Sequence, residues 1–93
     1  MYKVSNIVEV MEANSAAGFH FFDSGTMSFF ASRIHGDLLP GKRFITSEKR
    51  CWDDETRRYT VRKFDVYTGH IETVGKFNQY ETYEEALEAA KKL

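Results

Sequence analysis

The sequence predicts a two-layer α+β domain in which helices cover one face of a three-stranded antiparallel sheet. Its 93 residues suffice for one compact domain. Helical spacing of apolar residues occurs near both ends of the chain, whereas the segment between them is rich in β-branched and aromatic residues. We therefore expect residues 1–93 to form a single domain with the order α-α-β-β-β-α.

Two interpretations are open for the first element. Apolar residues recur there at three- and four-residue steps, as on one face of a helix: Val4, Ile7, Val8 and Met11. Ser5 can cap such a helix, which would run to about Ala16 and stop at Gly18. Because many of these residues are β-branched, a strand over residues 4–12 is the alternative.

A second helix is expected before the only proline. Ser24 or Thr26 can cap it, and Gly36 follows its last turn. Apolar residues at helical spacing mark the side that faces the core: Met27, Phe30 and Ile34. Pro40 then marks the turn after which the pattern changes from helices to strands.

Three strands are expected after this turn, and their connections are short. The strands cover Arg43–Lys49, Arg57 to about Tyr67, and His70–Phe77. The connections at Asp53–Glu55 and Thr68–Gly69 are too short for a parallel crossover, so the strands should form an antiparallel meander. Gly69 should adopt a positive φ angle in the second turn.

The last helix is marked by its start and by its apolar stripe. Thr82 and Glu85 have the spacing of a capping box, while Glu88 and Lys92 have that of a stabilising i,i+4 ion pair. The stripe that should face the core consists of Tyr83, Ala86, Leu87, Ala90 and Leu93.

The total charge excludes proteins that act through bulk charge. Thirteen Lys and Arg against 14 Asp and Glu give a net charge of -1, too balanced for a nucleic-acid coat or for a DNA mimic. The charge is nevertheless uneven, since residues 42–63 carry +4, residues 1–41 carry -2 and residues 64–93 carry -3. A basic sheet face that binds nucleic acid would use Lys49, Arg50, Arg58 and Arg62. The alternative is pairing across the sheet, Glu48 with Arg58 and Glu72 with Arg62.

The sequence lacks the motifs of common catalytic and metal sites. It has no G-x-S-x-G, Walker or G-x-G-x-x-G motif, and its three histidines lack the spacing of a helical metal site. We therefore expect no enzymatic activity, no cofactor and no metal. Cys51 paired with His20, His35 or His70 is the enzymatic alternative, but a structural cysteine beside Trp52 is the interpretation that we favour.

Location follows from two further features of the sequence. A single cysteine, Cys51, permits no intramolecular disulfide, which is typical of cytoplasmic proteins. No apolar run approaches the roughly 18 residues that a membrane span requires. We expect a cytoplasmic protein that does not bind a membrane.

A resemblance adds an expectation about function. Residues 21–33 read Phe-Phe-x-x-x-Thr-Met-x-Phe-Phe-x-Ser-Arg, and the likeness continues through residues 43–48, 57–62 and 68–75 into the last helix. In this pattern the chain resembles short bacteriophage and prophage accessory proteins, most of which have no assigned function. The resemblance implies a protein of the host cytoplasm that binds a host protein, such as an anti-CRISPR-like or other anti-defence inhibitor.

An inhibitor of this kind needs exposed aromatic or Arg anchors and no active site. Phe29 and Arg33 share a face of the expected second helix that differs from the face carrying Met27, and Trp52 lies at the expected hairpin tip. These three residues are the candidate protein-binding anchors. The alternative is that Phe29 fills the core and Trp52 folds back over the sheet. The oligomeric state is left open.

Overall fold

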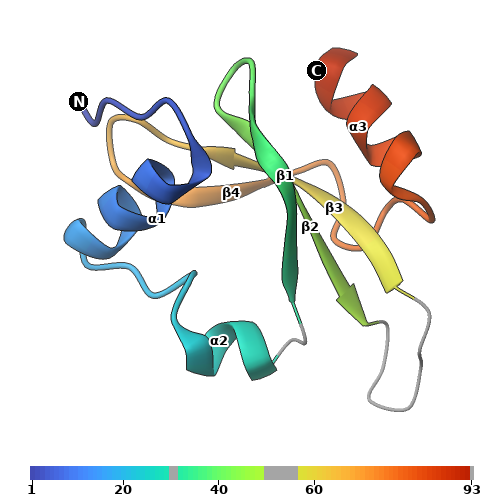
Figure 1. The fold of residues 1–93 in the computed structure, drawn as a ribbon, viewed down its shortest axis with the longest axis horizontal. Coiled ribbons are helices and arrows are strands. Elements are labelled where there is room, and N and C mark those ends of the chain that lie inside the picture. Colours follow the sequence, from blue (N-terminus) through green and yellow to red (C-terminus); the bar gives the residue numbers. More distant parts are fainter. Residues whose placement is uncertain (30–31, 50–56, 93) are drawn as a thin grey trace.

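The computed structural model describes residues 1–29, 32–49 and 57–92, which form three helices and one four-stranded antiparallel sheet (Figure 1). The elements are α1 (Ile7–Ala16), α2 (Ser24–Phe29), β1 (Arg33–Leu39), β2 (Arg43–Lys49), β3 (Arg57–Phe64), β4 (Ile71–Val74) and α3 (Tyr83–Lys92). The strands lie in the order β1-β2-β3-β4. The α+β class and the order of helices around a meander are confirmed, with four strands in place of three.

Strand β1 occupies a segment that the sequence assigned to the second helix. Helix α2 is only six residues long, and Ile34 lies in β1 opposite Thr46 of β2. Gly36 is inside this strand with a φ of 69°, where the pairing with β2 shifts register. A left-handed glycine is typical both of a helix end and of a bulge, so Gly36 gave a signal that fits either structure.

The register of β2 and β3 divides the sheet into two faces. Phe44 lies opposite Arg62, and Ile45 lies opposite Val61. Because successive side chains of a strand point to opposite faces, residues of equal parity in these strands lie together. The Phe44 face carries Phe44, Thr46, Glu48, Arg58, Thr60, Arg62 and Phe64. The Ile45 face carries Ile45, Ser47, Lys49, Arg57, Tyr59 and Val61.

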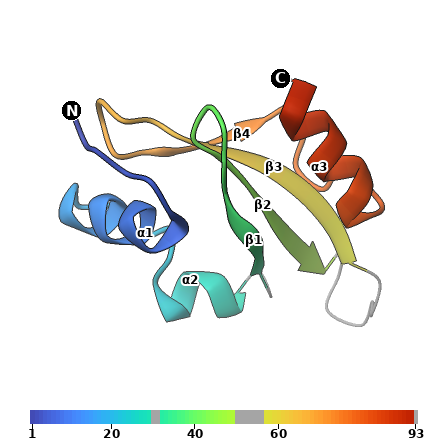
Figure 2. The ribbon, with the colours of Figure 1, turned by 45° about the horizontal axis from the view of Figure 1, so that its top comes forward.

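Each face of the sheet has its own hydrophobic core. On the Phe44 face, Val10 of α1 packs in a cluster with Phe44 and Phe64. On the Ile45 face, Ala86 and Ala90 of α3 pack with Ile45 and Val61. Figure 2 shows α1 and α3 on opposite sides of the strands. The expectation that all helices cover one face is therefore wrong, because β2 and β3 carry apolar residues on both faces, and each apolar cluster needs a cover.

Helix α1 is capped one residue later than expected, by Asn6 in place of Ser5. Asn6 is the N-cap, and its side chain accepts a hydrogen bond from the Glu9 backbone N–H at 2.9 Å. The Glu9 carboxylate in turn accepts hydrogen bonds from the Ser5 hydroxyl and from the Ser5 backbone N–H, which lower the pKa of Glu9. Helix α1 thus begins at Ile7, within residues 4–12, and the strand alternative for that segment is excluded.

The turn between β3 and β4 rests on α1. Gly69 has a φ of 81°, as its place in a tight turn predicts, and its carbonyl accepts a hydrogen bond from the Asn14 side chain at 2.8 Å. A Cβ atom at position 69 would lie 2.6 Å from the Cβ of Ala17. Only glycine therefore fits between this turn and the helix.

Helix α3 begins and pairs as the sequence predicts. The Glu85 backbone N–H donates to the Thr82 hydroxyl at 3.2 Å, and Lys92 lies 3.8 Å from Glu88. Strands β3 and β4 are shorter than expected, since they end at Phe64 and Val74. Among the described residues, none of the helices has the length and apolar character needed to cross a membrane.

Candidate functional site

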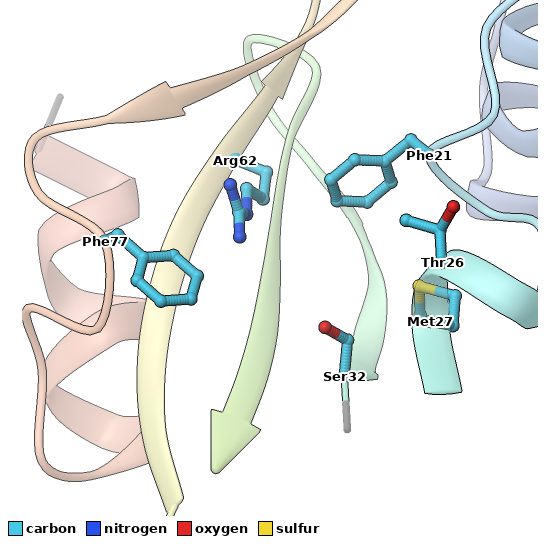
Figure 3. A pocket seen from close by; sticks show the side chains of 6 residues that line it. All are labelled: Phe21, Thr26, Met27, Ser32, Arg62 and Phe77. Atoms are coloured by element: carbon cyan, nitrogen blue, oxygen red, sulfur yellow. The ribbon is translucent and has the colours of Figure 1, made fainter. Parts of the chain in front are cut away.

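A pocket opens on the Phe44 face, where α2 and the loop before α3 approach the sheet (Figure 3). Its volume is about 330 Å³, and its lining consists of Phe21, Thr26, Met27, Ser32, Arg62 and Phe77. These residues come from α2 and the segments on either side of it, from β3 and from the loop that follows β4. The volume lies at the lower end of the range for ligand pockets, which suits one bulky side chain better than an extended substrate.

The two aromatic walls of the pocket, Phe21 and Phe77, differ in how far they are packed into the core. Phe21 is packed edge-on against Phe22 and Phe44, with ring centroids 4.8 and 6.3 Å away, so it is part of the core. Phe77 is 52% exposed, although it lies in an apolar pocket wall. A large exposed aromatic beside a pocket is a typical interface anchor.

The loop that carries Phe77 is held by hydrogen bonds on either side of it. The Lys76 backbone N–H donates to the Gln79 side chain at 2.9 Å, and the Asn78 backbone N–H donates to the Thr60 hydroxyl at 2.9 Å. Asn78 adopts a φ of 58°, a left-handed conformation that Asn tolerates better than most residues. Phe77 is therefore exposed at a fixed position.

Arg62 lies between the two aromatic walls (Figure 3). Its guanidinium carbon is 5.3 Å from the ring centroid of Phe21 and 5.4 Å from that of Phe77, within the range of cation–π interactions. Its Nε donates to the Thr46 hydroxyl at 3.1 Å, and its Nη1 donates to the Thr73 hydroxyl at 2.5 Å. Arg62 is thus clamped in place at the base of the pocket.

The charge of Arg62 is balanced by Glu48, which is 1% exposed. Arg62 Nη2 lies 3.0 Å from Glu48 Oε1. The hydroxyls of Thr46 and Thr60 also donate to the Glu48 carboxylate, at 2.7 and 3.1 Å. A buried carboxylate requires such partners, because burial of an unpaired charge is costly. The pocket therefore presents a positioned guanidinium whose charge is largely compensated.

This ion pair corrects the cross-strand pairs expected from the sequence. Glu48 pairs with Arg62 and not with Arg58, which lies 2.9 Å from Glu81. Glu72 lies opposite Lys63, so its side chain points to the Ile45 face, away from Arg62. The correct partners depend on register, which a single sequence does not specify.

The comparisons with known proteins give one match. Residues 6–91 match the model of a family of unknown function, DUF7447. The chain belongs to this family. The matched range extends from the N-cap of α1 into α3 and contains every residue that lines the pocket. No curated protein and no solved structure matches the chain.

The basic residues proposed to bind nucleic acid do not share one face in this DUF7447 chain. Arg58 and Arg62 lie on the Phe44 face, and each has a carboxylate partner. Lys49 lies on the Ile45 face, and Arg50 is outside the described residues. The expected basic face of four residues is therefore not formed by the three that the structure describes.

Of the three candidate protein-binding anchors, the structure describes the side chain of Arg33 alone. Arg33 is exposed, as an anchor should be, but it begins β1 and shares no helix face with Phe29. The Phe29 side chain lies outside the described structure, as do Trp52 and Cys51. These roles of Phe29 and Trp52 stay predictions.

The pocket residues Phe21, Met27 and Phe77 were not predicted as site residues from the sequence, where Met27 was assigned to the core-facing side of a helix. Phe21 and Met27 lie in the segment that carries the resemblance, so a signal was present there. No sequence signal marked Phe77 as a site residue, because its exposure depends on the conformation of the loop that follows β4. The described residues contain no group of three or more His, Cys, Asp or Glu side chains placed to share a metal ion.

Proposed function

We propose that this protein is a non-enzymatic binding module that receives an apolar side chain of a partner protein in the pocket between Phe21 and Phe77. The observation that carries the proposal is Phe77, an aromatic side chain that is 52% exposed and held at the rim of an apolar pocket. Aromatic residues beside well-packed pockets contribute most of the affinity in many protein interfaces.

Arg62 supports a protein partner over a nucleic acid at this site. Its Nε, Nη1 and Nη2 all donate hydrogen bonds within the domain, and Glu48 compensates its charge. A phosphate group would have to compete with a carboxylate that is already in place. A partner side chain that covers the pocket needs only to exclude water from the rings and from the guanidinium stacked between them.

The partner class that best fits the sequence resemblance is a host protein. Short phage-type accessory proteins commonly bind and disable a component of the host cell, including its defence machinery. We propose this class of role, an anti-CRISPR-like or other anti-defence inhibitor included, and we propose the host cytoplasm as its location. The small pocket and its fixed rim support a role by occlusion, in which no covalent step is required.

Affinity capture from bacterial host lysate tests the proposal with two matched variants. Phe77→Ala removes the exposed wall of the pocket, whereas Tyr67→Ala removes an aromatic that is 78% exposed and does not line the pocket. We expect wild type and Tyr67→Ala to capture the same protein, and Phe77→Ala to bind it at least about 30-fold more weakly. Equal capture by all three proteins would refute the assignment of the pocket.

A further inference from the structure

Ser32 contributes a hydroxyl group to the pocket on the Phe44 face. Figure 3 shows its side chain turned toward the space between Phe21 and Phe77. The Ser32 backbone N–H donates to the Met27 carbonyl at 2.8 Å, so the backbone at this position is anchored to α2. Within the described structure the Ser32 hydroxyl makes no hydrogen bond. It is therefore available to a group that enters the pocket.

The other polar groups of the described lining are turned away or already bonded. Thr26 directs its methyl group toward the pocket and its hydroxyl away from it (Figure 3). Each nitrogen of the Arg62 guanidinium donates a hydrogen bond within the domain. Phe30 and Ala31 precede Ser32 outside the described structure, and neither has a side-chain group that can form a hydrogen bond. Ser32 is thus the polar side chain of the described lining that is open to a guest.

The walls and the base of the pocket favour an aromatic guest over an aliphatic one. Phe21 and Phe77 flank the space, and aromatic pairs are stabilised by more than the area that they bury. Arg62 at the base attracts the electron-rich face of a further ring. Its side chain is 11% exposed, so the guest has only a small charged surface to cover. A leucine side chain would cover the same surface without either gain.

The hydroxyl of Ser32 distinguishes a tyrosine guest from a phenylalanine guest. A phenylalanine ring that filled the pocket would cover this hydroxyl and leave it without a partner, which weakens binding. A tyrosine ring fills the same space and carries a phenolic hydroxyl, which can donate to a serine hydroxyl and accept from it. Sites that form a hydrogen bond to a ligand hydroxyl discriminate against the analogue that lacks it.

We infer that the pocket binds a tyrosine side chain of the partner protein, with the ring between Phe21 and Phe77 and the phenolic hydroxyl bonded to Ser32. This inference rests on the proposed function, because it names the side chain that the pocket would receive. It makes Ser32 the residue that determines specificity, whereas Phe77 contributes affinity for any apolar guest.

Blocked amino acids test the inference without the partner protein. N-acetyl-tyrosinamide and N-acetyl-phenylalaninamide differ only in the phenolic hydroxyl, and titrations followed by two-dimensional NMR give the affinity of each. We expect wild type to bind the tyrosine amide about fivefold more tightly, and Ser32→Ala to bind the two amides equally. The control Ser28→Ala changes an exposed serine of α2 that does not line the pocket, so it should keep the preference. Equal binding of both amides by wild type, or an unchanged preference in Ser32→Ala, would overturn the inference.

Further measurements locate the bound ring and identify its chemistry. The tyrosine amide should shift the NMR signal of the Arg62 Nε–H, because a ring above the base of the pocket lies close to this group. An unchanged Arg62 signal would place the binding elsewhere and would contradict the inference. Tighter binding of N-acetyl-tryptophanamide would assign the pocket to tryptophan and would also contradict it. Unchanged thermal unfolding of the variants shows that each is folded.

Phe77→Ala separates this inference from the proposed function. The variant should bind both amides more weakly and should keep the preference for tyrosine, because Ser32 is unchanged. If Phe77→Ala binds both amides like wild type, the assignment of the pocket fails and the tyrosine assignment fails with it. If Phe77→Ala weakens both amides but wild type shows no preference between them, the tyrosine assignment alone fails and the pocket stands.

Discussion

Arg62 and Glu48 form a buried ion pair across the Phe44 face, with Nη2 and Oε1 3.0 Å apart. The two residues are not direct cross-strand neighbours, since Arg62 lies opposite Phe44 and Glu48 lies opposite Arg58. Glu48 lies four residues along β2 from Phe44, and Thr46 between them bonds both partners, Arg62 at 3.1 Å and Glu48 at 2.7 Å. It fixes the guanidinium at the base of the pocket, so it connects the stability of the sheet to the shape of the site.

The first prediction concerns this pair. Glu48→Gln removes the charge but nearly preserves the shape, and leaves Arg62 as a buried cation without its partner. We expect the free energy of unfolding, measured with urea, to fall by about 3 kcal/mol. Glu81→Gln is the control, because its pair with Arg58 is largely exposed at Glu81, and it should cost less than about 1 kcal/mol. A similar small effect at both positions would show that the buried pair contributes little.

The second prediction separates the role of Phe77 from that of the core. Phe77→Ala should change the free energy of unfolding by less than about 1 kcal/mol, because half of the side chain already faces solvent. Phe44→Ala should cost about 3 to 5 kcal/mol, because Phe44 is fully buried. Thermal unfolding of both variants provides the comparison. A large loss of stability in Phe77→Ala would mean that this aromatic serves the fold and not a partner.

The third prediction is a pH dependence of stability that arises at His35. Its pKa is lower in the folded protein than its ordinary value of 6.5, first because of burial and then because of Arg57 and Arg33. Below this ordinary value the unfolded chain binds more protons at His35 than the folded chain does. The contribution of His35 is therefore complete above about pH 6.5 and is lost as the pH falls through the folded pKa.

Urea unfolding between pH 5 and 7.5 measures this effect. Stability should rise with pH in wild type, and His35→Gln should flatten the curve over this range. The control His20→Gln changes an exposed histidine and should leave the rise in place. An unchanged slope in His35→Gln would assign the pH dependence to other groups.

The fourth prediction concerns Gly69. Gly69→Ala introduces a Cβ at a φ of 81° and at 2.6 Å from the Ala17 Cβ, so it should destabilise the domain by about 2 kcal/mol or more. Gly25→Ala is the matched control, since Gly25 lies within α2 and a Cβ there meets no atom within 4 Å. That substitution should leave stability unchanged or raise it by up to about 1 kcal/mol. The melting temperature should therefore fall clearly in Gly69→Ala and should stay the same or rise in Gly25→Ala, each relative to wild type.

Local signals in the sequence were sufficient for several elements. Strand β2 has the predicted bounds, Arg43–Lys49, and α3 begins at the predicted cap. The positive φ of Gly69 also follows from its turn. These features depend on residues close in the sequence, where propensity, capping and turn chemistry act. These features could therefore be predicted without knowledge of the tertiary structure.

Features that depend on residues distant in the sequence could not be predicted from local signals. Gly36 fits a helix end as well as a bulge, and only its pairing with β2 decides between them. The pocket brings Phe21, Arg62 and Phe77 together from separate segments. The partner of Arg62 depends on strand register, in which a shift by one residue reverses every side chain. The candidate site was thus less predictable than the elements that build it.

The central strands β2 and β3 serve both hydrophobic cores, with Phe44 and Phe64 on one side and Ile45 and Val61 on the other. Neither core can come apart without disturbing the strands on which the other is built. We expect the domain to lose its structure in a single cooperative step, with the slowest amide hydrogen exchange in this pair of strands. A ligand held on either face would then slow exchange throughout the molecule, far beyond the residues that it touches.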